Sequence, residues 1–366
     1  MNHTLTYQIA LTKIPMVGLW TARLLIRACG SAEAVFSQNK KTLGKIPRIS
    51  AAIANNIANA DPEALSAPDL SFINEHKIKP LFFTDPDYPS RLKPFSDSPM
   101  ILYYKGNANL NADRIVSIVG TRTPTKSGKM HCEEIVEGLA KYNVLIISGL
   151  AYGIDVTAHQ KCLSLQIPTV GVLGHGMSQI YPAAHKPIAA RMLEQGGILT
   201  QFGPDKGPER EHFPMRNGVV AGMSDAVIVV ETARKGGSMI TAELANGYNK
   251  DVFAVPGRVN DPFSKGCNHL IKAHKAQLLE SAEDIAYVMR WTEADKPTQN
   301  QTALFPDLNV NEKNILNLIG ETHQINIDQL AYQAKLNSSE MATLILQLEF
   351  KGLIKTLPGK RFVLVE

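Results

Sequence analysis

The chain has 366 residues, enough for about two or three domains, and hydrophobic residues make up 44% of it. No apolar run approaches the roughly 18 residues that a membrane span needs, and the start lacks the basic and apolar blocks of a signal peptide, so we expect a cytoplasmic protein without membrane contact. The formal net charge is +4, and four scattered cysteines without a CxxC pair argue against disulfides and cysteine-bound metals.

Residues 1–65 are predicted to form a helical domain. Two helical patterns, Leu19–Cys29 and Ser50–Ala60, each follow a tight turn that contains Gly18 or Gly44. This repetition is consistent with tandem helix-hairpin-helix units of a SAM-like fold, in which backbone N–H groups at the start of a helix face a phosphate. A small helical bundle whose turns bind nothing explains the pattern equally well.

Positive charge is concentrated at the start of the chain. Residues 1–60 carry seven lysines and arginines against one acidic residue, Glu33. Residues 308–366 carry six basic and six acidic residues. The first segment therefore favours a polyanionic partner, whereas the last segment does not.

A linker and two β-like segments are predicted after the helical domain. Residues 61–69 contain two Asp/Pro pairs, which are typical of a linker. The apolar segments 80–83 and 100–104 follow, and we expect them to extend the central sheet.

Residues 70–290 are predicted to form an α/β core around a doubly wound parallel sheet. Short β-branched apolar runs end at turn residues and alternate with helical patterns, as in a doubly wound sheet that is covered on both faces. The runs are residues 115–119, 144–147, 169–173, 226–230 and 252–255.

The end of the chain has the pattern of a winged helix. Residues 291–306 show no periodicity and are predicted to be a flexible linker. Residues 307–366 contain three helical patterns followed by two β-like runs around a Pro-Gly turn, which is typical of a winged-helix domain. Ser338 and Ser339 are expected to cap the third helix.

No common catalytic or nucleotide-binding signature is present. The turn after the first run begins at Gly120 and contains no GxGxxG, and the Gly-Lys pair at Gly128 is followed by methionine rather than by the Ser or Thr of a P-loop. Asp155 and His159 stand at i and i+4 and could form an acid–base pair, but a structural role is the preferred interpretation. His175 has no metal-ligand spacing around it. We therefore expect no catalytic residue, no cofactor and no metal.

Glycine-rich polar loops follow the ends of the runs, where α/β sheets bind ligands. Residues that supply charge, hydroxyl groups or close backbone approach to an oxyanion are Arg122, Ser148, Gly149, Arg216, Lys235, Gly237, Ser238 and Thr241. Ser238 and Thr241 are also expected to cap the helix that follows them, so that its first N–H groups face the ligand. Any single loop is equally well explained as a turn without a ligand, but four loops with three cations predict a phosphate-binding pocket.

Five motifs in these loops form an ordered set. They are Ile118–Arg122, Ser148–Asp155, Phe213–Asn217, Gly237–Ala242 and Phe253–Gly257. In this order they resemble the signature of the DprA/Smf family of bacterial DNA-processing proteins. The resemblance is strongest over residues 80–290, for which it implies an extended Rossmann-like domain. The helical start and winged end agree with the longer members of that family.

The resemblance implies a homodimer that binds and protects single-stranded DNA during natural transformation and loads the RecA recombinase onto it, without enzymatic turnover. By motif, the DNA contacts are expected at Arg122, Ser148, Gly149, Arg216, Asn217, Gly237, Ser238 and Thr241. We add Lys235 for its charge and Tyr152 for its place in the second motif. A basic groove with backbone donors grips phosphates and reads no base sequence.

Two positions depart from the family pattern. Tyr152 stands where members usually carry arginine or lysine, and Gly218 stands where arginine usually follows the Arg-Asn pair. Losing two cations should weaken binding by one counterion-release increment each. Tyr152 either stacks on a base, which is worth about 1–3 kcal/mol, or packs against the neighbouring helix.

Two other functions are alternatives to DNA binding by the core. Residues 236–243 resemble the PGGxGTxxE motif of nucleotide phosphoribohydrolase-like Rossmann enzymes, with Glu243 in the equivalent place. However, Met239 and Ile240 replace the Gly-Thr pair that cradles phosphate in those enzymes. A winged-helix transcription regulator with a ligand-sensing core is the second alternative, although the neutral winged segment argues against strong duplex binding. The basic N-terminal domain either extends the DNA path or only supports the core.

Overall fold

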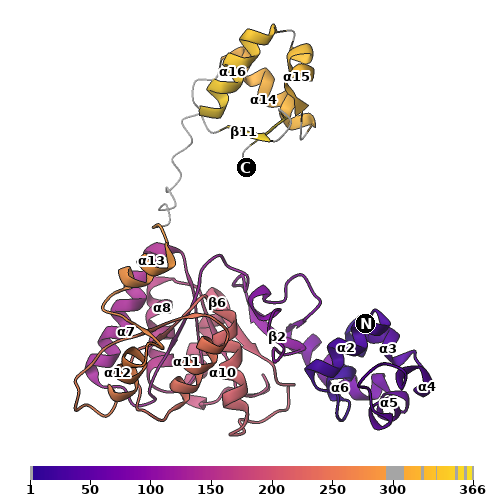
Figure 1. The fold of residues 1–366 in the computed structure, drawn as a ribbon, viewed down its shortest axis with the longest axis vertical. Helices are drawn as coiled ribbons and strands as arrows, with labels where there is room; N and C mark the ends of the chain where they lie inside the picture. Colours follow the sequence, from indigo (N-terminus) through magenta and orange to yellow (C-terminus); the bar gives the residue numbers. More distant parts are fainter. Residues whose placement is uncertain are drawn as a thin grey trace. The chain divides into compact units, whose positions relative to one another are not determined.

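The structure is a computed structural model that describes residues 3–293, 309–322, 325–334, 336–350, 353–357 and 361–364. The chain divides into two compact units, Met1–Ala294 and Asp295–Glu366. Figure 1 shows the elements of each unit. Within the described residues, no helix combines the length and apolar character needed to cross a bilayer.

The first unit is built around a nine-stranded sheet in the order β1-β2-β6-β5-β4-β3-β7-β8-β9. The strands are β1 (Lys79–Phe82), β2 (Ile101–Gly106), β3 (Ile115–Val119), β4 (Leu145–Ser148), β5 (Thr169–Val172), β6 (Gly196–Thr200), β7 (Ala226–Val229), β8 (Asp251–Ala254) and β9 (Gln277–Leu278). Strands from β6 across to β9 pair in parallel, whereas β2 pairs antiparallel with both β1 and β6. The predicted α/β core with a mostly parallel sheet, extended by two N-terminal strands, is therefore confirmed.

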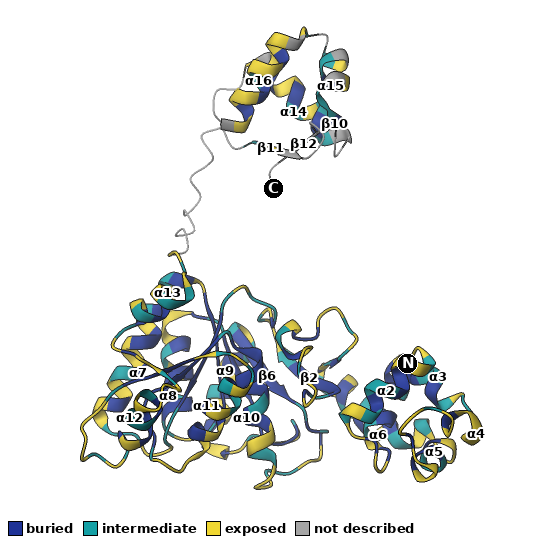
Figure 2. Ribbon diagram, viewed as in Figure 1, coloured by how far each residue is buried: buried dark blue, intermediate teal, exposed yellow. Residues whose placement is uncertain are grey.

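Helices cover both faces of this sheet, as the near-continuous apolar runs predict. The core helices are α7 (Lys126–Leu139), α8 (Ile154–Leu165), α9 (Lys186–Gln195), α10 (His212–Met223), α11 (Gly237–Gly247), α12 (Lys265–Lys272) and α13 (Ala282–Met289). On β3, Val116 and Ile118 pack in one cluster with side chains of α7, α8 and α13. Ile115 and Val119 pack in the other cluster, with side chains of α10, α11 and α12. Figure 2 shows the sheet as the buried middle layer of this unit.

Strand β6 was not among the predicted strands. It begins with Gly196 and Gly197, which interrupt the apolar pattern that marks the other strands. A Cβ on Gly197 would lie 2.5 Å from the Tyr104 ring on β2, so the close packing of β2 against β6 requires glycine there.

Six helices precede the sheet. They are α1 (His3–Lys13), α2 (Leu19–Cys29), α3 (Ala32–Phe36), α4 (Lys40–Leu43), α5 (Ala51–Ala58) and α6 (Pro62–His76). Their buried side chains, such as Ile9 and Leu25, share one cluster with Phe82, Ile101 and Tyr103 of β1 and β2. The helical segment therefore packs directly on the antiparallel edge of the sheet.

The prediction of a linker over residues 61–69 is wrong, because these residues form the cap and the first half of helix α6. Asp61 caps this helix by accepting hydrogen bonds from the N–H groups of Glu63 and Ala64. Pro62 takes the first helical position, where its missing N–H costs nothing. The helix continues through Pro68, and Asp69 in the following position accepts a 2.6 Å hydrogen bond from Lys13 of α1. The Asp-Pro pair is thus a helix start rather than a chain linker.

The second unit has the predicted three helices and β-hairpin. Its elements are α14 (Val310–Thr322), β10 (Ile325–Asn326), α15 (Ile327–Ala334), α16 (Ser338–Phe350), β11 (Ile354–Leu357) and β12 (Arg361–Leu364). The strands form an antiparallel sheet in the order β10-β12-β11, and Ile315, Leu330 and Phe362 belong to one buried cluster. Most of the predicted linker, residues 294–306, lies outside the described residues.

The cap of α16 differs from the prediction. Asn337, the residue before the helix begins at Ser338, accepts the hydrogen bond from the N–H of Glu340, at 2.9 Å. Asparagine is as good a helix cap as serine, so the helix starts where expected but through a different side chain.

Candidate functional site

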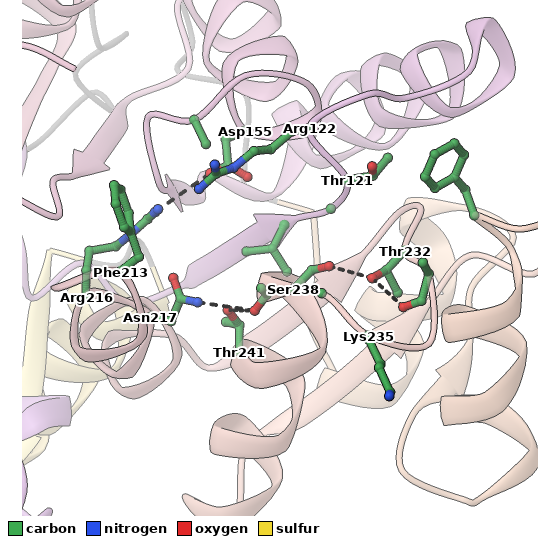
Figure 3. Close-up of a pocket in the computed structure, with 17 residues that line it drawn as sticks. Thr121, Arg122, Asp155, Phe213, Arg216, Asn217, Thr232, Lys235, Ser238 and Thr241 are labelled. Carbon is green, nitrogen blue, oxygen red and sulfur yellow. Dashed lines mark hydrogen bonds and ion pairs between the residues drawn. The ribbon is translucent and has the colours of Figure 1, made fainter. Parts of the chain in front are cut away.

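A crevice of about 300 Å³ opens at the carboxyl ends of β3 and β7. These strands are neighbours in the sheet, but the chain leaves β3 towards β4 and returns at β7 only after passing through β5 and β6. Such a switch in strand order is where open α/β sheets leave room for a ligand. Seven of the predicted site residues line the crevice: Arg122, Arg216, Asn217, Lys235, Gly237, Ser238 and Thr241. Figure 3 shows Arg122, Asp155 and Arg216 to one side, with Thr232 and Lys235 to the other.

Two exposed cations stand at the mouth of this crevice. Arg122 follows β3, and its guanidinium lies 5.5 Å from the centre of the Phe213 ring, a distance typical of a cation–π contact. Lys235 lies in the loop between β7 and α11. Among the described residues, no carboxylate is within ion-pair distance of either side chain. Both positive charges therefore remain available to an anionic ligand.

A third cation, Arg216, is buried at the wall of the crevice. Its side chain is paired with Asp155, with 3.7 Å between Nη1 and Oδ2, and Arg216 is only 6% exposed. Burial lowers the pKa of the Arg216 guanidinium and raises the pKa of the Asp155 carboxyl, while the charge of each opposes the shift of the other. Arg216 Nε is the one buried side-chain nitrogen or oxygen in the described residues without a hydrogen-bond partner.

Ser148 and Gly149 do not line the crevice but belong to the buried surroundings of the Arg216–Asp155 pair. The hydroxyl of Ser148 is fully buried and donates to the carbonyl of Ile118, at 2.5 Å. A Cβ on Gly149 would lie 1.6 Å from Arg216 Nη1 and 2.3 Å from Asp155 Oδ2. The predicted close backbone approach is therefore made towards a buried side-chain pair.

Tyr152 lies beside the crevice and does not line it. Its ring is 50% exposed and meets the His185 ring edge to face, with 4.9 Å between the centroids. It lines a smaller neighbouring pocket together with Tyr181 and Phe213. Arg122 and Arg216 belong to both pockets. Tyr152 thus packs on a neighbouring residue and still presents part of its ring to solvent.

The prediction that Ser238 and Thr241 cap α11 is wrong. Ser238 Oγ donates to Thr232 Oγ1 at 2.7 Å, and Thr241 Oγ1 donates back to the carbonyl of Gly237. Asn217 Nδ2 donates to the same carbonyl, at 3.2 Å. The cap position is Gly236, which offers no side chain to the first N–H groups of the helix. These groups therefore keep their hydrogen-bonding capacity for a ligand.

Asp155 and His159 do not form an acid–base pair. His159 is fully buried, and its Nε2 donates to the carbonyl of Gly149 at 2.6 Å, while Nδ1 lies 2.7 Å from the Thr169 hydroxyl. Burial lowers the pKa of His159 to about 4. Both polar atoms of the ring are engaged within the fold, so the structural interpretation is the one that the geometry supports.

His175 is likewise engaged within its own loop. Its Nε2 accepts a hydrogen bond from the N–H of Tyr181, and burial lowers its pKa. Within the described part of the chain, no three His, Cys, Asp or Glu side chains are close enough to hold a metal ion.

The crevice is also lined by residues that were not predicted as site residues, among them Phe213, Thr232 and Phe263. Phe213 opens the third motif, so the motif itself could have identified it. Thr232 and Phe263 lie in loops without a motif, and their position depends on the backbone bond from the Thr232 N–H to the Phe263 carbonyl. That contact between distant loops leaves no mark in the sequence.

The family model for the DNA recombination-mediator protein A matches residues 79–290, and a second model, for the DprA winged helix domain, matches residues 299–360. The chain belongs to the DNA recombination-mediator protein A family. The match covers the nine-stranded sheet and all four loops of the crevice. The predicted family resemblance is therefore confirmed.

Several members of the DNA recombination-mediator protein A family are similar over much of their length. Protein Smf of a Synechocystis strain is 33% identical over 327 residues, which cover 80% of this chain and 82% of that protein. The DNA processing protein DprA of Streptococcus pneumoniae is 39% identical over 201 residues, 55% of this chain and 71% of that protein.

Two solved structures of DNA processing protein A share this fold. The Streptococcus pneumoniae structure covers 79% of this chain and 99% of its own, with a TM-score of 0.67 and 30% identity. A Helicobacter pylori structure, described in terms of its single-stranded DNA binding mode, covers 58% of this chain and 96% of its own, with a TM-score of 0.53 and 30% identity.

Proposed function

We propose that the crevice holds the sugar–phosphate backbone of single-stranded DNA. The observation that carries this proposal is the pair of exposed cations, Arg122 and Lys235, which have no acidic partner among the described residues and stand beside the uncapped start of α11. Phosphates supply most of the affinity for an unpaired strand, and cations with backbone donors bind them without reading bases. Ser238, Thr241 and Asn217 hold the loop at Gly237 in place for this contact.

The comparisons support the same ligand. The structure from Helicobacter pylori, 30% identical to this chain, is described by the single-stranded DNA that the protein binds. Arg122, Gly149, Arg216 and Gly237 stand in motifs within the matched residues 79–290. We infer that Ser148 and Gly149 act indirectly, by positioning Arg216, and that Tyr152 offers its exposed ring at the side of the path.

We further propose that the protein works in the cytoplasm as a homodimer that protects incoming DNA and loads RecA onto it during natural transformation. Family membership supports this role. It is tested by sedimentation of the full chain and by RecA strand exchange on DNA coated with single-stranded-DNA-binding protein. A monomer, or strand exchange that the protein does not accelerate, would contradict this part of the proposal.

Binding without turnover is favoured over a phosphoribohydrolase activity. Glu243, which stands where those enzymes carry their motif glutamate, is on the outer side of α11 and accepts hydrogen bonds from Lys275 Nζ at 2.8 Å on both oxygens. It does not line the crevice. Incubation with nucleoside monophosphates should therefore release no free base.

The direct test is the affinity of Arg122→Ala for oligo-dT. Removing an exposed cation from the crevice should weaken binding about tenfold or more and lower the slope of log K against log salt by about 0.7. Arg191→Ala is the matched control, because Arg191 is an exposed arginine on α9 that lines neither the crevice nor the Tyr152 pocket. If the two variants bind oligo-dT with equal affinity, Arg122 is not part of the DNA site.

A further inference from the structure

The N-terminal helices carry a second surface suited to nucleic acid, distinct from the crevice. Two turns meet there, one before α2 and one before α5. Asn56 Nδ2 donates to the carbonyl of Pro15 at 3.2 Å, and the Arg48 guanidinium lies 5.3 Å from the centre of the Trp20 ring. The turns that the sequence presents as two separate repeats are therefore neighbours in space.

The side chains that these turns present are exposed. Trp20 is 47% exposed and Met16 is 64% exposed, although large apolar side chains usually lie inside. Lys45 and Arg48, on the second turn, are exposed as well. We call these four residues, Met16, Trp20, Lys45 and Arg48, the N-terminal patch. The turns around α4 and α5 are largely exposed in Figure 2.

The charge of the patch is not neutralised within its domain. Glu33 is the only acidic residue among residues 1–60, and it lies 3.6 Å from His3. Among the described residues, neither Lys45 nor Arg48 is within ion-pair distance of a carboxylate. The patch thus offers two cations without an acidic partner, and one of them, Arg48, lies over the ring of Trp20.

Both turns also hold their backbone in a costly conformation. Met16 has φ of 66° and Arg48 has φ of 69°, in the left-handed region that side chains other than glycine rarely adopt. Such residues concentrate at functional sites, where the surrounding fold holds a side chain in a required position. Arg48, one of these two residues, is the one whose guanidinium lies over the Trp20 ring.

We propose that the N-terminal patch is a second binding surface for an unpaired nucleic-acid strand. A base stacks on the open face of Trp20, and Arg48 and Lys45 contact the adjoining phosphates. An aromatic platform flanked by cations is the combination that binds single strands regardless of sequence. A duplex does not fit this surface equally well, because its bases are already stacked on one another.

Fluorescence of Trp20 tests the proposal directly. The chain has two tryptophans, and Trp291→Phe leaves Trp20 as the sole reporter in the full-length protein. Saturating oligo-dT should quench this fluorescence, whereas a duplex of the same length should not. Unchanged fluorescence at saturation would overturn the proposal. Quenching by phosphatidylglycerol vesicles but not by oligo-dT would assign the patch to lipid and overturn it as well.

Affinity measurements on the full chain give the second test. Trp20→Ala should weaken binding to long oligo-dT about tenfold. Arg48→Ala should lower the salt slope by about 0.7, and Arg27→Ala, which removes an exposed cation from the far end of α2, should leave the slope unchanged. If Arg48→Ala and Arg27→Ala lower the salt slope equally, the effect is one of general charge, which contradicts binding at the N-terminal patch.

These experiments distinguish a failure of the crevice proposal from a failure of the N-terminal patch proposal. If the crevice does not bind DNA, Arg122→Ala leaves the affinity unchanged while Trp20 is still quenched. If the patch does not bind DNA, Arg122→Ala weakens binding and Trp20 never responds. Persistent quenching in the Arg122→Ala variant, at higher oligonucleotide concentration, is the result expected when both surfaces bind.

Discussion

Gly149 leaves room for the buried pair of Arg216 and Asp155 beneath the crevice. Any side chain at this position would overlap the guanidinium, since even a Cβ would lie 1.6 Å from Nη1. The pair is also expensive to separate, because a buried charge without its partner costs several kcal/mol. The crevice wall therefore depends on a residue that contributes no side chain.

Gly149→Ala should lower the free energy of unfolding by about 1–3 kcal/mol, the usual cost of overpacking a core, and weaken oligo-dT binding by displacing Arg216. Gly247→Ala is the matched control, because nothing lies within 4 Å of its Cβ position at the end of α11. Urea denaturation and oligo-dT titration check both variants. An unchanged Gly149→Ala protein would show that Arg216 is not held as described.

His159 links the stability of the fold to pH. Its pKa is about 4 in the folded protein, because the ring is buried, against roughly 6.5 in an unfolded chain. Between these values only the unfolded chain binds the proton, so stability is lost as the pH falls from 6.5 towards 4. The loss attributable to this residue is about 3 kcal/mol.

His159→Gln should remove that component. Urea denaturation of the wild type between pH 7 and pH 4 should show a steeper decline than the variant, even though the variant is less stable at pH 7. His131→Gln, a substitution on α7 away from this hydrogen-bond network, should follow the wild-type curve. If the free energy of unfolding declines equally with falling pH in the wild type and in His159→Gln, proton uptake by His159 on unfolding does not cause the decline.

At the scale of elements, α6 shows how strongly a helix start can depend on one side chain. Asp61 accepts hydrogen bonds from two N–H groups, at 3.0 and 3.1 Å, and a negative charge at this end also complements the helix dipole. Asp61→Ala should therefore lower the free energy of unfolding by about 1 kcal/mol, whereas Asp61→Asn should retain most of it. Chemical denaturation monitored by circular dichroism distinguishes them, and equal stability of all three proteins would contradict the cap.

The elements that can be predicted from the sequence are those whose pattern reflects burial on both faces. Strands β3, β4, β5, β7 and β8 are such runs, and the polar loops that follow them identify seven of the crevice residues. Strand β6 escapes because Gly196 and Gly197 serve the packing of neighbouring strands. Helix α6 escapes because Asp-Pro pairs mark helix starts and loops alike.

The crevice itself is predictable in composition but not in detail. That Arg122, Arg216 and Lys235 supply its charge follows from their loops. Ser148 bonds the carbonyl of Ile118 rather than facing the crevice, and Ser238 bonds Thr232 instead of capping α11. Both results depend on side-chain directions, which no local sequence pattern predicts.

At the scale of the molecule, the crevice and the N-terminal patch both belong to the unit of residues 1–294. A protein that ends at residue 294 should therefore fold and bind oligo-dT within about twofold of the full chain, because none of the proposed contacts is removed. Oligo-dT titration and thermal unfolding check this. A large loss of affinity would mean that the winged-helix unit takes part in binding the strand.

Strand β2 presents its two faces to different neighbours. Ile101 and Tyr103 belong to the cluster of the N-terminal helices, while Leu102 and Tyr104 belong to that of the main sheet. A recombinant fragment that starts at Lys79, where the family match begins, would keep β1 but would expose Ile101 and Tyr103 on the face of β2 that the N-terminal helices cover. Such a fragment would be prone to aggregation, so expression plasmids for crystallography should retain the preceding helices, α1 to α6.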